Sequence, residues 1–136
     1  MSVYNINAGK SVKSGAAFAQ WEPVKISTED TENEGLVVVK TAATTDVVIG
    51  VAIDDATASG QGVDIALAGS VVLMRSGGVI TLGDYVGLSG TDKTEIATLS
   101  LSAGGGTLRQ VLGVALQTAA ENELIPVLFS PFVYEV

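Results

Sequence analysis

The chain has 136 residues, about one domain, and contains neither cysteine nor histidine. These absences exclude disulfides, thiolate nucleophiles, catalytic triads that use histidine, and zinc sites built from either residue. The formal net charge of −8 opposes binding to nucleic acids and to anionic membranes, and no apolar run approaches the ~20 residues of a membrane helix. Because the start also lacks a signal-peptide pattern, we expect a soluble protein made in the cytoplasm.

The first 22 residues differ from the rest and are predicted to form an extended N-terminal arm. Lys10 and Lys13 give this end a basic bias, which suits either an arm lying on a more acidic surface or a simple solvated terminus. Trp21 forms a small aromatic cluster with Phe18 and Pro23. Two roles fit Trp21, a lid over the core or an anchor that contacts a partner.

Three patterns could carry chemistry, but each has a simpler explanation or lacks a feature that such a site requires. Residues 9–11, Gly-Lys-Ser, lack the first glycine of a phosphate-binding loop. The acidic segment 28–35 lacks the residue order of an EF-hand and is predicted to be a solvated loop. Asp54-Asp55 could pair with Asp64 or Asp84 as acid and base, but bonds to nearby backbone N–H groups explain aspartates at turns. We therefore predict no catalytic residue, cofactor or metal ion.

Two stretches with the same pattern are predicted to be β-hairpins. Residues 47–69 place β-branched residues on both sides of a turn rich in aspartate and glycine, and residues 110–129 repeat the arrangement. Residues 48–53 align with 111–116 at an offset of 63 residues, glycine on glycine. The repeat predicts approximate internal symmetry, with a chance match between two buried strands as the alternative. Pro126 predicts an edge position or a bulge for its strand.

Strand patterns recur roughly every 8–12 residues, glycines mark frequent turns, and no amphipathic helix is evident. We therefore predict an all-β fold, either a small β-barrel or a β-sandwich. The chain is divided into the N-terminal arm at residues 1–22 and a single compact β domain at residues 23–136. The apolar tail with Phe132 and Tyr134 is expected either to tuck into this domain or to dock on a neighbouring molecule.

Four short motifs resemble one known family. They are the strand Gly50-Val51-Ala52, the strand end Gly69-Ser70-Val71, the turn Gly83-Asp84-Tyr85-Val86 and a second strand Gly113-Val114-Ala115. In this order and setting they resemble the small capsid decoration (cement) proteins of tailed bacteriophages. The resemblance covers roughly residues 8–129, most of the chain.

The resemblance implies a compact β-barrel or tulip-like β fold and a homotrimer on the outer surface of an icosahedral phage head. There the protein would brace the major capsid protein, as a virion component and not an enzyme. Alternatives are a ligand- or carbohydrate-binding β module of a phage head or tail appendage, and a small enzyme that uses carboxylates alone. Terminal segments would make the subunit and capsid contacts, and the candidate contact residues are Tyr4, Lys10, Lys13, Phe18, Trp21, Phe132 and Tyr134.

Overall fold

The computed structural model describes residues 9–28, 36–100 and 108–135, and within these ranges the regular elements are all β-strands. The predicted all-β class is confirmed. The first lobe contains β1 (Gly9–Ser14), β2 (Pro23–Ile26), β3 (Val37–Lys40), β4 (Gly50–Ala52) and β5 (Gly62–Ala66). The second lobe contains β6 (Val71–Arg75), β7 (Tyr85–Leu88), β8 (Ile96–Thr98), β9 (Leu108–Ala115) and β10 (Leu124–Glu135). No helix long and apolar enough to cross a membrane occurs in the described part of the chain.

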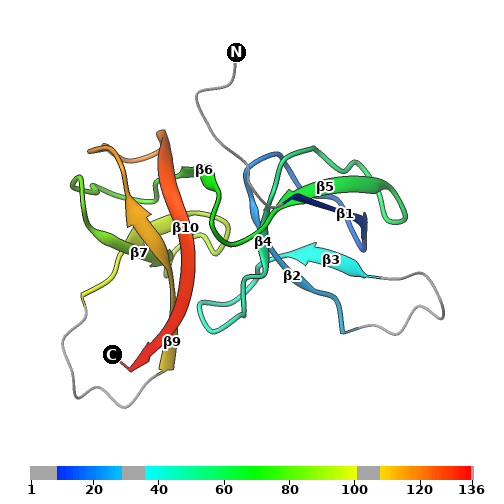
Figure 1. The fold of residues 1–136 in the computed structure, drawn as a ribbon, viewed down its shortest axis with the longest axis horizontal. Helices are drawn as coiled ribbons and strands as arrows, with labels where there is room; N and C mark the ends of the chain where they lie inside the picture. Colours follow the sequence, from blue (N-terminus) through cyan, green and yellow to red (C-terminus); the bar gives the residue numbers. More distant parts are fainter. Residues whose placement is uncertain (1–8, 29–35, 101–107, 136) are drawn as a thin grey trace.

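The two lobes lie side by side and repeat one strand arrangement (Figure 1). The first is a closed barrel in the order β1-β3-β2-β4-β5, and the second is a sheet in the order β6-β10-β9-β7-β8. The same succession of antiparallel pairs runs through both. The parallel pairing of β1 with β3 has its counterpart in a parallel bridge between Ser76 and Ile96. The internal symmetry predicted from the two hairpins is thus confirmed, and it extends over both lobes.

In each lobe, a buried serine at or just after the end of the first strand binds the corresponding hairpin loop. In the barrel, Ser14 Oγ donates a hydrogen bond to a carbonyl of the β4–β5 loop at 2.7 Å and accepts one from an N–H of that loop at 3.0 Å. In the second lobe, Ser76 Oγ makes the same two kinds of bond with the β9–β10 loop. These bonds satisfy buried hydroxyls that would otherwise destabilise the fold.

Glycine is required at the same point of both hairpins because the backbone of the partner strand passes close by. A Cβ atom on Gly113 would lie 1.8 Å from the carbonyl oxygen of Leu128, and one on Gly50 would lie 2.7 Å from that of Ala66. Such contacts are far inside van der Waals distance, so the two strands would have to separate. The glycine in each predicted strand therefore marks a close approach of another backbone.

Each lobe has an apolar core, and the second core reaches into the barrel. Phe18 is among the residues that fill the barrel interior. The second core surrounds Met74 and Phe129, and it also includes Val51 and Ala66 from the barrel strands β4 and β5. The hairpin of β4 and β5 therefore buries one side within the barrel and the other against the second lobe, which joins the two lobes.

The described part of the predicted arm belongs to the barrel. Residues 9–14 form β1, which pairs with β5 and, through Lys13 and Ser14, with β3. Phe18 lies in the barrel core. Sequence reasoning assigned this segment to an arm because Val12 is the only apolar residue in β1. The strands that hold β1 lie more than twenty residues further along the chain.

Pro126 lies in an interior strand of the second sheet, so the predicted edge position is wrong. Its strand, β10, runs between β6 and β9, and the irregularity in β10 lies between Phe129 and Phe132. The Pro126 carbonyl accepts a hydrogen bond from the Leu116 N–H at 2.9 Å, just past the end of β9. Because the N–H and C=O of a strand residue face the same neighbour, the donor that proline lacks faces this end of β9, not β6.

Replacing Gly113 with alanine is expected to lower the free energy of unfolding by about 3 kcal/mol, because the added methyl group collides with the β10 backbone. Gly62→Ala is the matched control, since it also lies in a strand and its Cβ would meet no atom within 4 Å. Urea denaturation followed by the fluorescence of Trp21 measures both variants. Equal unfolding midpoints would contradict the requirement for glycine.

Candidate interaction surfaces

The aspartates at the turns bind backbone N–H groups, but only Asp84 binds one that is nearby in the chain, as predicted. Asp54 Oδ2 accepts a hydrogen bond from the Asp64 N–H at 3.0 Å. Asp55 Oδ1 and Asp84 Oδ2 each accept one from a loop N–H, at 2.6 Å and 3.0 Å. Among the described residues, no three acidic side chains lie close enough to hold a metal ion. The predicted acidic loop, residues 28–35, falls outside the described residues apart from its first residue.

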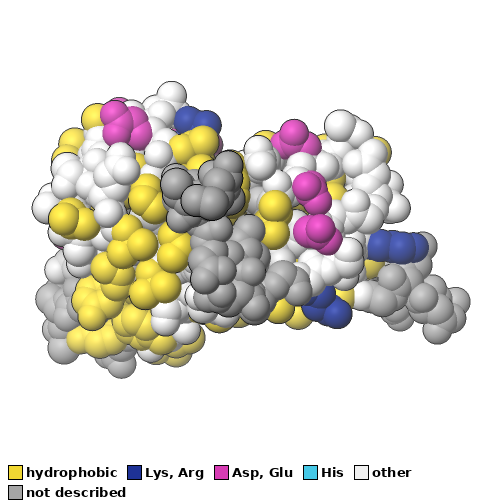
Figure 2. Space-filling model, turned by 45° about the horizontal axis from the view of Figure 1, so that its top comes forward, with side chains coloured by type: hydrophobic (Ala, Val, Ile, Leu, Met, Phe, Trp, Pro, Cys, Tyr) yellow, Lys and Arg dark blue, Asp and Glu magenta, His cyan; other side chains and the backbone are white. Residues whose placement is uncertain are grey.

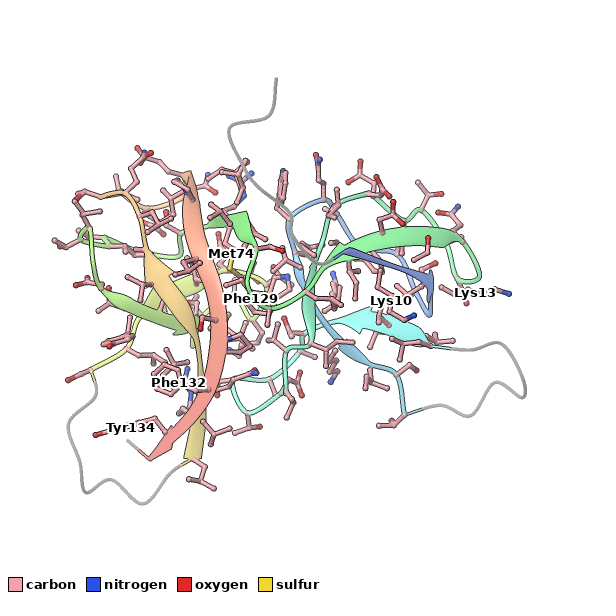
Figure 3. All side chains as sticks on the ribbon, viewed as in Figure 1. Lys10, Lys13, Met74, Phe129, Phe132 and Tyr134 are labelled. Carbon is pink, nitrogen blue, oxygen red and sulfur yellow. The ribbon has the colours of Figure 1, made fainter. Side chains whose placement is uncertain are left out.

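The candidate contact residues near the N-terminus lie in different environments. Lys10 and Lys13 are exposed on β1 (Figure 3). Phe18 is only 5% exposed in the barrel core, so it presents no surface to a partner. Trp21 is half-buried and packs against the second core. Tyr4 is outside the described residues.

The candidate contact residues near the C-terminus lie on β10. Phe132 and Tyr134 are on the opposite side of this strand from the core residue Phe129 (Figure 3). Phe132 is 41% exposed, and its ring meets that of Tyr85 edge-to-face, with the ring centroids 5.9 Å apart and an interplanar angle of 88°. Edge-to-face pairs are a favourable aromatic geometry, so each ring fixes the other in place. Tyr134 is half-buried.

Phe132 belongs to a larger apolar surface on the second lobe. Residues paired directly across antiparallel strands point to the same side, so Val71, Leu128, Val114 and Tyr85 form one row across β6, β10, β9 and β7. We call this row together with Phe132 the outer face. Figure 2 shows hydrophobic side chains gathered on the lobe that carries it.

Apart from Phe132, sequence reasoning missed the outer face, although the sequence carries a signal for it. The hairpin pattern assigns alternate residues of 125–129 to the core. The intervening positions, Leu124, Pro126 and Leu128, are apolar as well. A strand that is apolar on both sides must be covered on both or must present an apolar surface. The pattern does not say which of the two holds.

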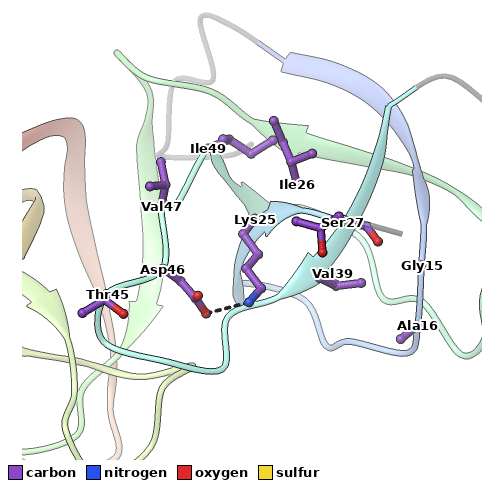
Figure 4. A pocket seen from close by; sticks show the side chains of 11 residues that line it. Gly15, Ala16, Lys25, Ile26, Ser27, Val39, Thr45, Asp46, Val47 and Ile49 are labelled. Carbon is purple, nitrogen blue, oxygen red and sulfur yellow. Dashed lines mark ion pairs between the residues drawn. The ribbon is translucent and has the colours of Figure 1, made fainter. Parts of the chain in front are cut away.

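A second surface feature is an open groove on the barrel, with a volume of about 610 Å³ (Figure 4). It lies between β2 and residues 45–49, and its wall combines apolar side chains with an ion pair of 3.0 Å between Lys25 Nζ and Asp46 Oδ2. In the second lobe, Gly87 occupies the position of Lys25, and Leu99 packs over it. In the second lobe, the Leu99 side chain thus occupies the region that corresponds to the open groove of the barrel.

Asp46 braces the loop beside this groove. Burial by itself raises the pKa of the Asp46 carboxyl, but hydrogen bonds from the Ala42 N–H, from Lys25 and from the Ala43 N–H, together with the Lys25 charge, outweigh it. The two backbone bonds measure 2.7 Å and 2.8 Å. The pKa of Asp46 therefore lies below its ordinary value, and the side chain acts as a charged acceptor that orders the loop.

Comparison with known proteins finds a matching fold. No protein-family model matches the sequence, and no curated protein does. The structure is similar to the crystal structure of the N base of head fiber gp8.5 in bacteriophage phi29, with a TM-score of 0.66 and 16% sequence identity. The two proteins share a fold. The match covers 90% of this chain and 93% of the head fiber base, so both lobes belong to the shared fold.

Replacing Asp46 with alanine is expected to lower the free energy of unfolding by about 1–2 kcal/mol at neutral pH, because Lys25 and two backbone N–H groups lose their acceptor. Since the folded-state pKa is lowered, the carboxylate stabilises the fold fully above its unfolded pKa, and this stabilisation is lost as the pH falls through the folded pKa. The difference from wild type should therefore shrink as the pH falls below the ordinary pKa of an aspartate, about 4.

Urea denaturation at a series of pH values measures this difference. Thr45→Ala, at an exposed neighbouring position, serves as the control and should match wild type throughout. A difference between Asp46→Ala and wild type that grows as the pH falls would contradict the role given to the carboxylate.

Proposed function

We propose that this protein is a non-enzymatic structural component of a bacteriophage head, where it forms the base of an appendage on the outer surface. The observation that carries the proposal is the match of fold, over nearly the full length of both chains, with a head fiber base. The sequence motifs that resemble capsid decoration proteins support the same location on the virion. Aspartates that bind loop backbone groups also fit a role without catalysis.

A base of an appendage and a bracing decoration protein attach to the same shell but act differently. A decoration protein bridges neighbouring subunits and strengthens the head, whereas a base anchors a further structure. We favour the base because the matching fold is that of a head fiber base. In both roles the partner is the major capsid protein.

We also propose that the protein assembles as a homotrimer at threefold positions of the head. A symmetric oligomer placed on a symmetric lattice engages several weak contacts at once, which raises the overall affinity without any single strong contact. The net charge of −8 keeps the free copies soluble before attachment.

Lys10 and Lys13 are the proposed contacts with the shell. Both are exposed on β1, and they are two of only seven basic residues in the chain. Positive charges on a strongly acidic protein can orient it toward an acidic surface, because they attract where the rest of the molecule repels. A strand of a closed barrel holds them in fixed positions.

The purified protein is expected to co-sediment with heads of the encoding phage that were prepared without it. Pelleting with quantification of the bound protein measures this. The temperature at which the heads release their DNA then separates the two roles, because a bracing protein raises it and an appendage base leaves it unchanged. A folded protein that fails to bind the heads would contradict the proposal.

Reversing the charge of both lysines, with Lys10→Glu and Lys13→Glu in one chain, is expected to weaken binding to heads at least about tenfold. Binding of the wild type should also weaken as salt is added, because exposed charges are screened. Lys40→Glu, at another exposed lysine, is the matched control and should bind like wild type. Unchanged binding by the double variant would rule out the lysines as contacts.

A further inference from the structure

The outer face of the second lobe has an equivalent in the barrel. Val51 and Ala66 are paired across β4 and β5, and the residues at the same place in the second hairpin are Val114 and Leu128. Val51 and Ala66 are fully buried in the core that the two lobes share. Leu128, in contrast, is 38% exposed. The same face of the repeated unit is therefore covered in one lobe and open in the other.

Neighbouring positions show the same contrast. Pro23 pairs with Val51 and is buried, whereas its counterpart Tyr85 is 42% exposed. Ile53 packs against the shared core, whereas its counterpart Leu116 is 42% exposed. Within the chain, the second lobe covers this face of the barrel. In the described part of the chain, no third lobe covers the face of the second.

The open face has the chemistry of a contact between proteins. The exposed parts of the Tyr85 and Phe132 rings offer roughly 150 Å², and Leu116 and Leu128 raise the open apolar area to roughly 300 Å². A stable interface buries about 800 Å² on each partner, a little more than half of it apolar. The outer face together with Leu116 thus supplies most of the apolar area that one subunit contact needs.

Charge indicates which partner fits. The five residues of the outer face carry no charge, although the chain has a net charge of −8. Two copies of such a chain repel each other over most of their surfaces. They can approach closely where no charge must be buried, and the five residues of the outer face meet this condition.

We infer that the outer face is the contact through which one copy of this chain binds a second copy. The second copy would cover the outer face of the second lobe, just as the second lobe covers the equivalent face of the barrel within one chain. Tyr85 and Phe132 would lie at the centre of this contact, since aromatic residues dominate the energetics of interfaces. The inference deepens the proposed homotrimer and depends on that part of the proposed function.

Sedimentation velocity of the full chain, from about 1 to about 100 µM, tests the inference. The wild type should associate, and Leu128→Glu should weaken its self-association at least about thirtyfold, because a carboxylate would be buried in an apolar contact. Val79→Glu is the matched control, since Val79 is 77% exposed and lies outside the outer face. It should associate like wild type.

Circular dichroism shows whether each variant is folded. If Leu128→Glu does not fold, Phe132→Gln, at a 41% exposed position, takes its place. A wild type that stays monomeric over the whole range would overturn the inference, and so would a folded outer-face variant that associates normally. Binding to heads is a separate measurement. An oligomer that dissociates in Leu128→Glu but never binds heads would contradict the proposed function and support this inference.

Discussion

The structure depends on the burial of one short hairpin between two cores. The β4–β5 hairpin directs Ala52 and Ile65 into the barrel, and it directs Val51 and Ala66 into the core of the second lobe. Apolar burial on both sides means that neither lobe can move away without exposing apolar surface to water, so we expect the lobes to unfold together. The contact between the two lobes also covers the barrel's equivalent of the outer face, whereas the outer face of the second lobe stays open.

The two lobes share an unusual backbone conformation, a positive φ, at equivalent positions, but the residue types there differ. Trp21 and Gly83 take equivalent places before β2 and β7, and both have a positive φ, of 69° and 90°. Their N–H groups donate to equivalent carbonyls, those of Ala52 and Ala115. Glycine adopts this conformation freely, whereas tryptophan does so at a cost in strain. The packing of the Trp21 ring against the shared core offsets that strain, so this departure from the repeat stabilises the contact between lobes.

The sequence motifs resemble capsid decoration proteins, whereas the matching fold is that of a head fiber base. The motifs behind the resemblance include Gly50 and Gly113, which are the positions where a neighbouring backbone passes too close for any side chain. Such residues report the requirements of a fold. They carry little information about what the surface of that fold binds, because binding depends on exposed residues such as Phe132 and Lys10. For this reason the motifs resemble decoration proteins while the matched structure is a head fiber base.

By itself, the sequence determined most of the strands, the two hairpins and local turns such as the one at Asp84, because these follow from local periodicity and from bonds between near neighbours. The tertiary structure alone decided that residues 9–14 complete a barrel and that Phe18 lies in its core, since their partners are distant in the chain. It also decided the state of the outer face. A period of two shows that both sides of residues 124–128 are apolar, but only the contact between lobes decides which side water reaches.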